Sequence, residues 1–161
     1  MAQTLDEDLD GSGLSIAIAV ARFNTVVTER LLAGALEGLN ALGVDTTGTV
    51  IAWVPGSFEL AYAAQRLAAS GRFDAVICLG CVIKGETDHD QYINQQAARG
   101  IAEVSTSTGV PAIFGVLTTG SLEQALARAE EGTTNKGYEA ASAAVVMANL
   151  RRKLSADGSP T

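Results

Sequence analysis

The stretch D-A-V-I-C-L-G-C-V-I, residues 74–83, indicates the fold of this chain. After Asp74 every position is apolar or glycine, with no alternation between apolar and polar residues, so both faces of the segment are expected to be buried. Strands that are buried on both faces are typical of the middle of a parallel sheet with helices on each side. The stretch therefore predicts the central strand of an α/β fold.

Strand and helix patterns alternate on either side of this segment. Strands are expected at 14–20, 49–54 and 112–118. Helices are expected at about 28–42, 57–70, 88–107 and 136–154, and a capping box of Ser121 and Gln124 opens one more. This alternation predicts a three-layer α/β/α sandwich of the flavodoxin-like kind, with a central four-stranded parallel sheet.

Length and charge limit the possible organisation and partners. The 161 residues fit one domain, which we place at 14–154, with an acidic flexible arm at 1–13 and a loose tail at 155–161. A net charge of −7 argues against nucleic acid or an anionic membrane as partner. No apolar run approaches the roughly 18 residues of a membrane span, and the acidic N-terminus is unlike a signal peptide, so we expect a cytoplasmic protein.

The two cysteines, Cys78 and Cys81, form a C-x-x-C inside the predicted central strand. Redox motifs of that spacing open a helix, where the thiolate is stabilised. Residues three apart in a strand point to opposite faces, so the two sulfur atoms are not expected to meet. We interpret both cysteines as core residues.

Aromatic, polar and glycine residues gather at the ends of the predicted strands. In open parallel sheets, ligands bind beyond the carboxyl ends of the strands. Phe23 and Phe58, beside Glu59, suit a flat heterocycle that stacks and forms hydrogen bonds. The segments at these ends are 22–24, 55–59, 84–89 and 118–120.

The segment K-G-E-T-D-H-D-Q-Y, residues 84–92, holds the only histidine, His89, among several acids. Thr87 and Asp90 form a capping-box pattern, which predicts the start of a helix. A metal site is the less favoured alternative, because one imidazole has no second His or Cys nearby in the chain. Free N–H groups at a helix start favour a phosphate site, with His89 beside the anion as a proton-transferring group.

Five motifs in this order and spacing resemble the 6,7-dimethyl-8-ribityllumazine synthase family. They are R-F-N (22–24), V-P-G-S-F-E-L (54–60), G-C-V-I-K-G-E-T-x-H (80–89), P-A-I-F-G-V-L-T-T (111–119) and N-K-G-x-E-A-A (135–141). The resemblance covers about residues 14–154. Asp90 and Gln91 depart from it, since family members commonly have an aromatic residue and then an acid at these positions.

The resemblance implies an enzyme of riboflavin biosynthesis that needs no cofactor and no metal. It condenses 5-amino-6-(D-ribitylamino)uracil with 3,4-dihydroxy-2-butanone 4-phosphate and releases phosphate and water. His89 is implied as the proton carrier. The implied pyrimidine and ribityl contacts are Phe23, Ser57, Phe58, Glu59, Cys81, Val82, Ile83, Phe114 and Lys136, and the implied contacts of the phosphate substrate are Gly85, Glu86, Thr87 and Arg128.

The family also implies a homo-oligomer whose sites lie between subunits, with the residue at the Phe114 position supplied by a neighbour. A homopentamer is expected, a sixty-subunit icosahedral shell is a further candidate, and riboflavin synthase is a candidate partner. The low charged fraction, 18%, agrees with extensive subunit contacts. Two alternatives stay open: a flavin-binding or storage protein, and a catalytically idle shell protein.

Overall fold

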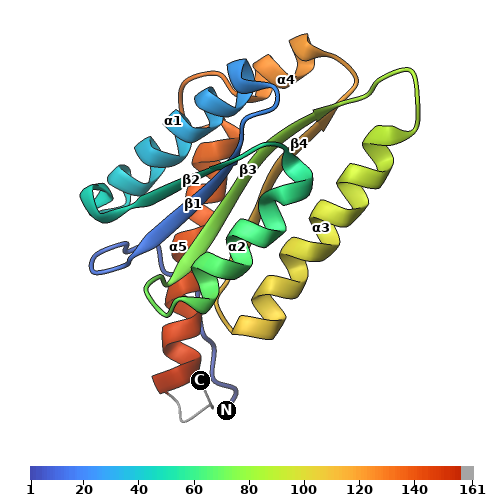
Figure 1. Ribbon diagram of the computed structural model, residues 1–161. Helices are drawn as coiled ribbons and strands as arrows, with labels where there is room; N and C mark the ends of the chain where they lie inside the picture. Colours follow the sequence, from blue (N-terminus) through green and yellow to red (C-terminus); the bar gives the residue numbers. More distant parts are fainter. Residues whose placement is uncertain (157–161) are drawn as a thin grey trace.

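The computed structural model describes residues 1–156 and is built around a four-stranded parallel sheet (Figure 1). The strands lie in the order β2 (Val50–Val54), β1 (Ile16–Ala21), β3 (Ala75–Ile83) and β4 (Ala112–Thr119). Every pair of neighbours is parallel. Residues 75–82 of β3 are all buried, which confirms the prediction of a central strand that is covered on both faces.

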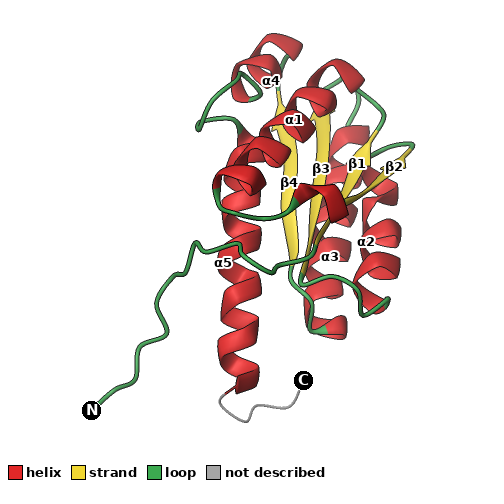
Figure 2. Ribbon diagram, turned by 90° about the vertical axis from the view of Figure 1, so that its left-hand side faces the viewer, coloured by secondary structure: helices red, strands yellow, loops and turns green. Residues whose placement is uncertain are grey.

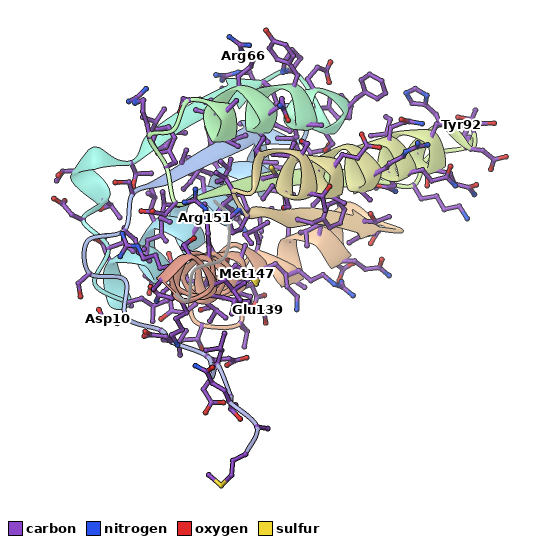
Figure 3. The ribbon with its side chains drawn as sticks, turned by 90° about the horizontal axis from the view of Figure 1, so that it is seen from below. Asp10, Arg66, Tyr92, Glu139, Met147 and Arg151 are labelled. Atoms are coloured by element: carbon purple, nitrogen blue, oxygen red, sulfur yellow. The ribbon has the colours of Figure 1, made fainter. Side chains whose placement is uncertain are left out.

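Helices cover both faces of the sheet and complete the three predicted layers (Figure 2). One face packs against α1 (Thr25–Ala41) and α5 (Lys136–Ala156), and the other packs against α2 (Leu60–Ala69) and α3 (His89–Thr108). A short helix, α4 (Leu122–Arg128), follows β4. Seen from below, Arg66 and Tyr92 project on the α2–α3 side, while Glu139 and Met147 project from α5 (Figure 3).

The composition of β1 explains the different packing of the two faces. Ile16, Ile18 and Val20 enter the core under α1 and α5, whereas the alanines between them enter the core under α2 and α3. Side chains of a strand alternate between the two faces of a sheet, so the alternation I-A-I-A-V-A places large residues on one side and small residues on the other. Small side chains allow the helices of that side to approach the sheet closely.

Three helix boundaries differ from the sequence prediction. α1 begins at Thr25 rather than near Thr28, because Asn24 adopts a left-handed conformation and turns the chain directly from β1 into the helix. Residues 57–59 form a separate 3-10 turn before α2. α5 continues to Ala156, so the first two residues of the expected tail are helical, and 157–161 lie outside the described residues.

The start of α5 is held by Asn135, which is buried directly before the helix. Its Oδ1 accepts hydrogen bonds from the main-chain N–H groups of Gly137 (2.7 Å) and Tyr138 (3.3 Å). Its Nδ2 donates to the main-chain oxygen of Arg30 in α1, at 3.2 Å. One side chain therefore caps α5 and joins it to α1.

The acidic N-terminal segment, expected as a flexible arm, forms hydrogen bonds to α5. The Nδ2 of Asn149 donates to the main-chain oxygens of Asp8 and Asp10, both at 2.9 Å. Lys153 Nζ donates to the main-chain oxygen of Asp6 at 2.8 Å. Within residues 1–156, no helix has the length and apolar character needed to cross a membrane.

Candidate active site

The carboxyl ends of the parallel strands meet at one edge of the sheet, at the top of Figure 1, and a cavity of about 620 Å³ opens there. It brings together predicted site residues from β1, β2, β3 and the start of α3. Its lining residues are Phe23, Pro55, Gly56, Ser57, Phe58, Glu59, Cys81, Val82, Ile83, Gly85, Thr87, His89, Asp90 and Ile93.

Two exposed phenylalanine side chains line this cavity. Phe23 is 71% exposed and Phe58 is 60% exposed. Large aromatic side chains that remain this accessible beside a cavity suit a ligand that covers them. With Glu59 and strand-end backbone nearby, the arrangement suits a flat ligand that has both stacking faces and polar edges.

Two hydrogen bonds outside the regular strand pairing hold Phe23 in place. Its main-chain N–H donates to the Pro55 oxygen at 3.0 Å, which joins the ends of β1 and β2. The next residue, Asn24, donates from Nδ2 to the Cys81 oxygen at 2.8 Å, which joins the ends of β1 and β3. These two bonds locate the aromatic side chain relative to both neighbouring strands.

A glycine in β3 allows the 57–59 turn to approach the sheet. A β-carbon built on Gly80 would lie 2.4 Å from the Oγ of Ser57, which is buried. Any larger residue would therefore clash with the Ser57 side chain at this position. Ser57, Phe58 and Glu59 consequently depend on Gly80 for their distance from β3.

The turn before α3 contradicts part of the prediction for residues 84–92. The helix starts at His89, and the main-chain N–H of His89 contacts Thr87 Oγ1 at 3.4 Å. The predicted capping box of Thr87 and Asp90 is wrong, because the cap position falls on Asp88, which makes no side-chain cap bond. Asp90 instead turns inward, and its Oδ1 is buried with no partner among residues 1–156.

The other predicted feature of this turn, an anion-binding backbone, stays a prediction. Gly85 and Thr87 line the cavity directly before the first turn of α3. Within the described chain, their main-chain N–H groups form no hydrogen bond to protein. Free N–H groups at the start of a helix attract an anionic group.

The cysteine motif has no redox geometry. Cys78 and Cys81 are both free and buried, and their side chains enter the cores on opposite faces of the sheet. Burial raises the pKa of Cys78 to about 12 and that of Cys81 to about 11. The burial of both side chains confirms the core interpretation, and a thiol with a raised pKa stays protonated near neutral pH.

No metal-ligand cluster accompanies His89. Over residues 1–156, no group of three or more His, Cys, Asp or Glu side chains converges as metal ligands would. The acids around His89 therefore lack the arrangement that a metal ion requires.

Four predicted residues lie outside the cavity. Phe114 and Lys136 line a second cavity, of about 250 Å³, between β4 and α5, where Lys136 Nζ pairs with Glu139 at 2.9 Å. Arg128, at the end of α4, donates from Nη1 to its own helix at the Gln124 oxygen, at 3.0 Å. Glu86 is exposed on the turn before α3 and does not line the cavity. A single chain therefore does not bring all of the predicted site residues together in one cavity.

Four residues of the cavity are not among the predicted site contacts, namely Pro55, Gly56, Asp90 and Ile93, of which the first two belong to the strand-end segment 55–59. Ile93, one turn into α3, had no local signal, because an isoleucine there resembles any core-facing helix residue. Asp90 was interpreted as a capping residue and is found in the cavity wall. The sequence carried one signal for Asp90: family members commonly have an aromatic residue at this position.

The protein is an open parallel α/β sheet with an aromatic cavity beyond its strand ends, which is where proteins of this fold class generally bind small ligands. The family model described as 6,7-dimethyl-8-ribityllumazine synthase matches residues 13–152 of the 161-residue chain. The chain therefore belongs to this family of transferases in riboflavin biosynthesis.

Proposed function

We propose that this protein condenses 5-amino-6-(D-ribitylamino)uracil with 3,4-dihydroxy-2-butanone 4-phosphate to form 6,7-dimethyl-8-ribityllumazine, releasing phosphate and water. The observation that carries the proposal is one cavity lined by Phe23, Phe58 and Glu59 together with His89. Stacking surfaces, a polar edge and a proton-transferring group are what the aminopyrimidine and its condensation need.

The aminopyrimidine binds in the aromatic part of the cavity. Its ring stacks on Phe23, while Ser57, Phe58 and Glu59 contact the ring edge and the ribityl chain. The main chain of residues 81–83 supplies further donors and acceptors along the same edge. Each of these contacts orients the 5-amino group, which is the nucleophile.

The phosphate substrate binds at the turn before α3. Gly85 and Thr87, whose N–H groups have no protein acceptor among the described residues, lie beside the anion there, with Glu86 close by in the chain. The lining residues include acids and one histidine but no Lys or Arg. A cation is needed to balance the phosphate, and we assign this role to Arg128.

His89 moves protons during the condensation. The amine attacks the ketone, loss of water gives an imine, phosphate leaves, and the ribitylamino nitrogen closes the ring with loss of a second water. A positioned acid–base group contributes roughly 10²–10⁴-fold to such steps, whereas orientation of two substrates contributes roughly 7–11 kcal/mol. We therefore expect positioning to contribute more than His89.

A neighbouring subunit completes the site in this proposal. Phe114 and Lys136 share a cavity apart from the one that holds Phe23 and His89, so they reach that site from a second copy of the chain. We infer the homopentamer for this arrangement, with the sixty-subunit shell as a higher assembly and riboflavin synthase as a candidate partner. A size measurement by light scattering distinguishes these assemblies.

The activity test mixes the purified protein with both substrates and follows lumazine fluorescence, after subtraction of the uncatalysed condensation. Wild type is expected to exceed this background clearly. Arg128→Ala loses most of the excess rate and His89→Ala loses less. Arg66→Ala removes an exposed arginine of α2 outside the cavity and serves as the matched control.

A wild-type rate equal to the background would contradict the synthase proposal. The flavin-binding or storage hypothesis uses the same phenylalanine side chains without any need for His89 or Arg128. Tight flavin binding without turnover would favour it, and assembly without affinity for either ligand would favour an idle shell protein.

A further inference from the structure

Asn24 is the one non-glycine residue of the described chain with a positive φ, at φ 60° and ψ 45°. It stands between the last residues of β1 and the first turn of α1. Left-handed backbone costs roughly 1–2 kcal/mol for most residues, and asparagine tolerates it better than other side chains do. Such a conformation beside a binding cavity is a reason to look for a role.

The Asn24 side chain does not cap the helix that it precedes. It makes no side-chain cap bond to α1, although asparagine is a preferred residue at that position. Its Nδ2 instead donates to the main-chain oxygen of Cys81, at 2.8 Å. The partly buried amide therefore joins residues that are 57 positions apart in the chain.

This bond lies beyond the point where the regular strand pairing ends. The β1–β3 pairing runs from Ile16 with Ala75 to Val20 with Leu79. The Asn24–Cys81 bond continues the connection past this point, to the segment 81–83 that lines the cavity. Without it, the ends of the two strands would have no such link at the cavity.

We propose that Asn24 is a positioning residue of the site: its amide sets the separation between the Phe23 ring and the main chain of residues 81–83, between which the heterocycle binds. The inference rests on the proposed function, because it concerns the aminopyrimidine half of that site. Asn24 does not line the cavity and need not touch the substrate.

The Cys81 oxygen has a second consequence for the ligand. Because Asn24 already donates to this oxygen, one of the two acceptor positions of the Cys81 carbonyl is occupied when the ring binds. An aspartate at position 24 would place a carboxylate oxygen against the Cys81 main-chain oxygen. Both atoms accept hydrogen bonds and neither can donate one. Asn24→Asp is therefore expected to part the strand ends, although the two side chains have nearly the same shape.

Three substitutions separate the amide from the backbone conformation. Asn24→Gly keeps the left-handed conformation without strain and removes the amide. Asn24→Ala removes the amide and adds strain. Asn40→Ala, at an exposed asparagine of α1 that accepts a bond from Thr46, is the matched control.

For Asn24→Gly we expect the KM of the aminopyrimidine to rise about tenfold, the KM of the phosphate substrate to stay within about twofold, and the melting temperature to stay near that of wild type. Asn24→Ala shows the same change in KM and a lower melting temperature. Asn24→Asp shows the largest rise in the KM of the aminopyrimidine. Asn40→Ala leaves both KM values unchanged.

Unchanged KM values in Asn24→Gly, or an equal rise in both, would overturn the inference and leave only a local structural role. A fluorescence titration with riboflavin gives a readout that does not depend on turnover. If wild type lacks activity, the proposed function fails, and the positioning role stands only if Asn24→Gly weakens riboflavin binding about tenfold. Absence of riboflavin binding to an inactive wild type would overturn both.

Discussion

Gly137 of α5 lies against Leu31 of α1 so closely that a β-carbon on the glycine would be 1.9 Å from the Leu31 main-chain oxygen. No side chain can occupy that space, so the separation of the two helices depends on this glycine. Gly137 directly follows Lys136, which is one of the proposed site residues. The packing of α1 against α5 thus sets the place of a proposed binding residue.

Gly137→Ala is expected to lower the free energy of unfolding by about 3 kcal/mol or more, because the contact is with rigid backbone rather than a movable side chain. Urea unfolding followed by circular dichroism measures this loss. Gly48→Ala is the control, since nothing lies within 4 Å of a β-carbon there. Equal stability of the two variants would show that α1 and α5 can move apart at little cost.

Asn135→Ala is expected to lower the free energy of unfolding by about 2–3 kcal/mol. The substitution removes the cap of α5, leaves the main-chain N–H of buried Gly137 without its acceptor, and breaks the bond to the Arg30 oxygen of α1. Chemical denaturation measures the change, with Asn40→Ala as an exposed control whose effect stays within about 0.5 kcal/mol. A loss as small as that of the control would exclude Asn135 as the link between α1 and α5.

Phe23→Ala is expected to raise the KM of the aminopyrimidine about 10–100-fold, which corresponds to the roughly 1–3 kcal/mol of one stacked base. Its side chain is 71% exposed, so the melting temperature should change little. Phe23→Trp keeps a stacking surface and should restore most of the affinity. Equal KM values for the Ala and Trp variants would argue against stacking.

The buried thiols predict a loss of stability at high pH. In the unfolded chain each thiol ionises near pH 9, whereas burial raises the pKa of Cys78 to about 12 and that of Cys81 to about 11 in the fold. Between pH 9 and these pKa values, the two thiols lose their protons in the unfolded chain but keep them in the native protein. Stability is therefore complete below about pH 9 and falls as pH rises toward 11, by about 1.4 kcal/mol per pH unit for each thiol.

Cys78→Ala isolates the contribution of one thiol. The stability difference between wild type and this variant should shrink by about 1.4 kcal/mol for each pH unit above 9. Urea unfolding at pH 8, 9 and 10 measures both proteins under the same conditions. Parallel pH profiles would mean that Cys78 ionises alike in both states.

The central sheet was predictable because its signal is local. The apolar run of β3 and the alternation of β1 specify burial over a few neighbouring residues, and β3 was confirmed as the central strand. The cavity residues within 22–24, 55–59 and 84–89 followed from the strand order, because parallel strands place their carboxyl ends at one edge. The capping box at Thr87 failed because the same residue types also suit a turn in which Asp90 faces inward.

The sequence by itself determined the layer order, the family and the cavity edge, since periodicity and ordered motifs depend on residues close together in the chain. Only the tertiary structure decided that Asn24 reaches Cys81, that Asn135 reaches Arg30, and that Phe114 and Lys136 lie apart from His89. These relations depend on strand register and helix separation. Both are set by packing over the whole core, which no local stretch of sequence encodes.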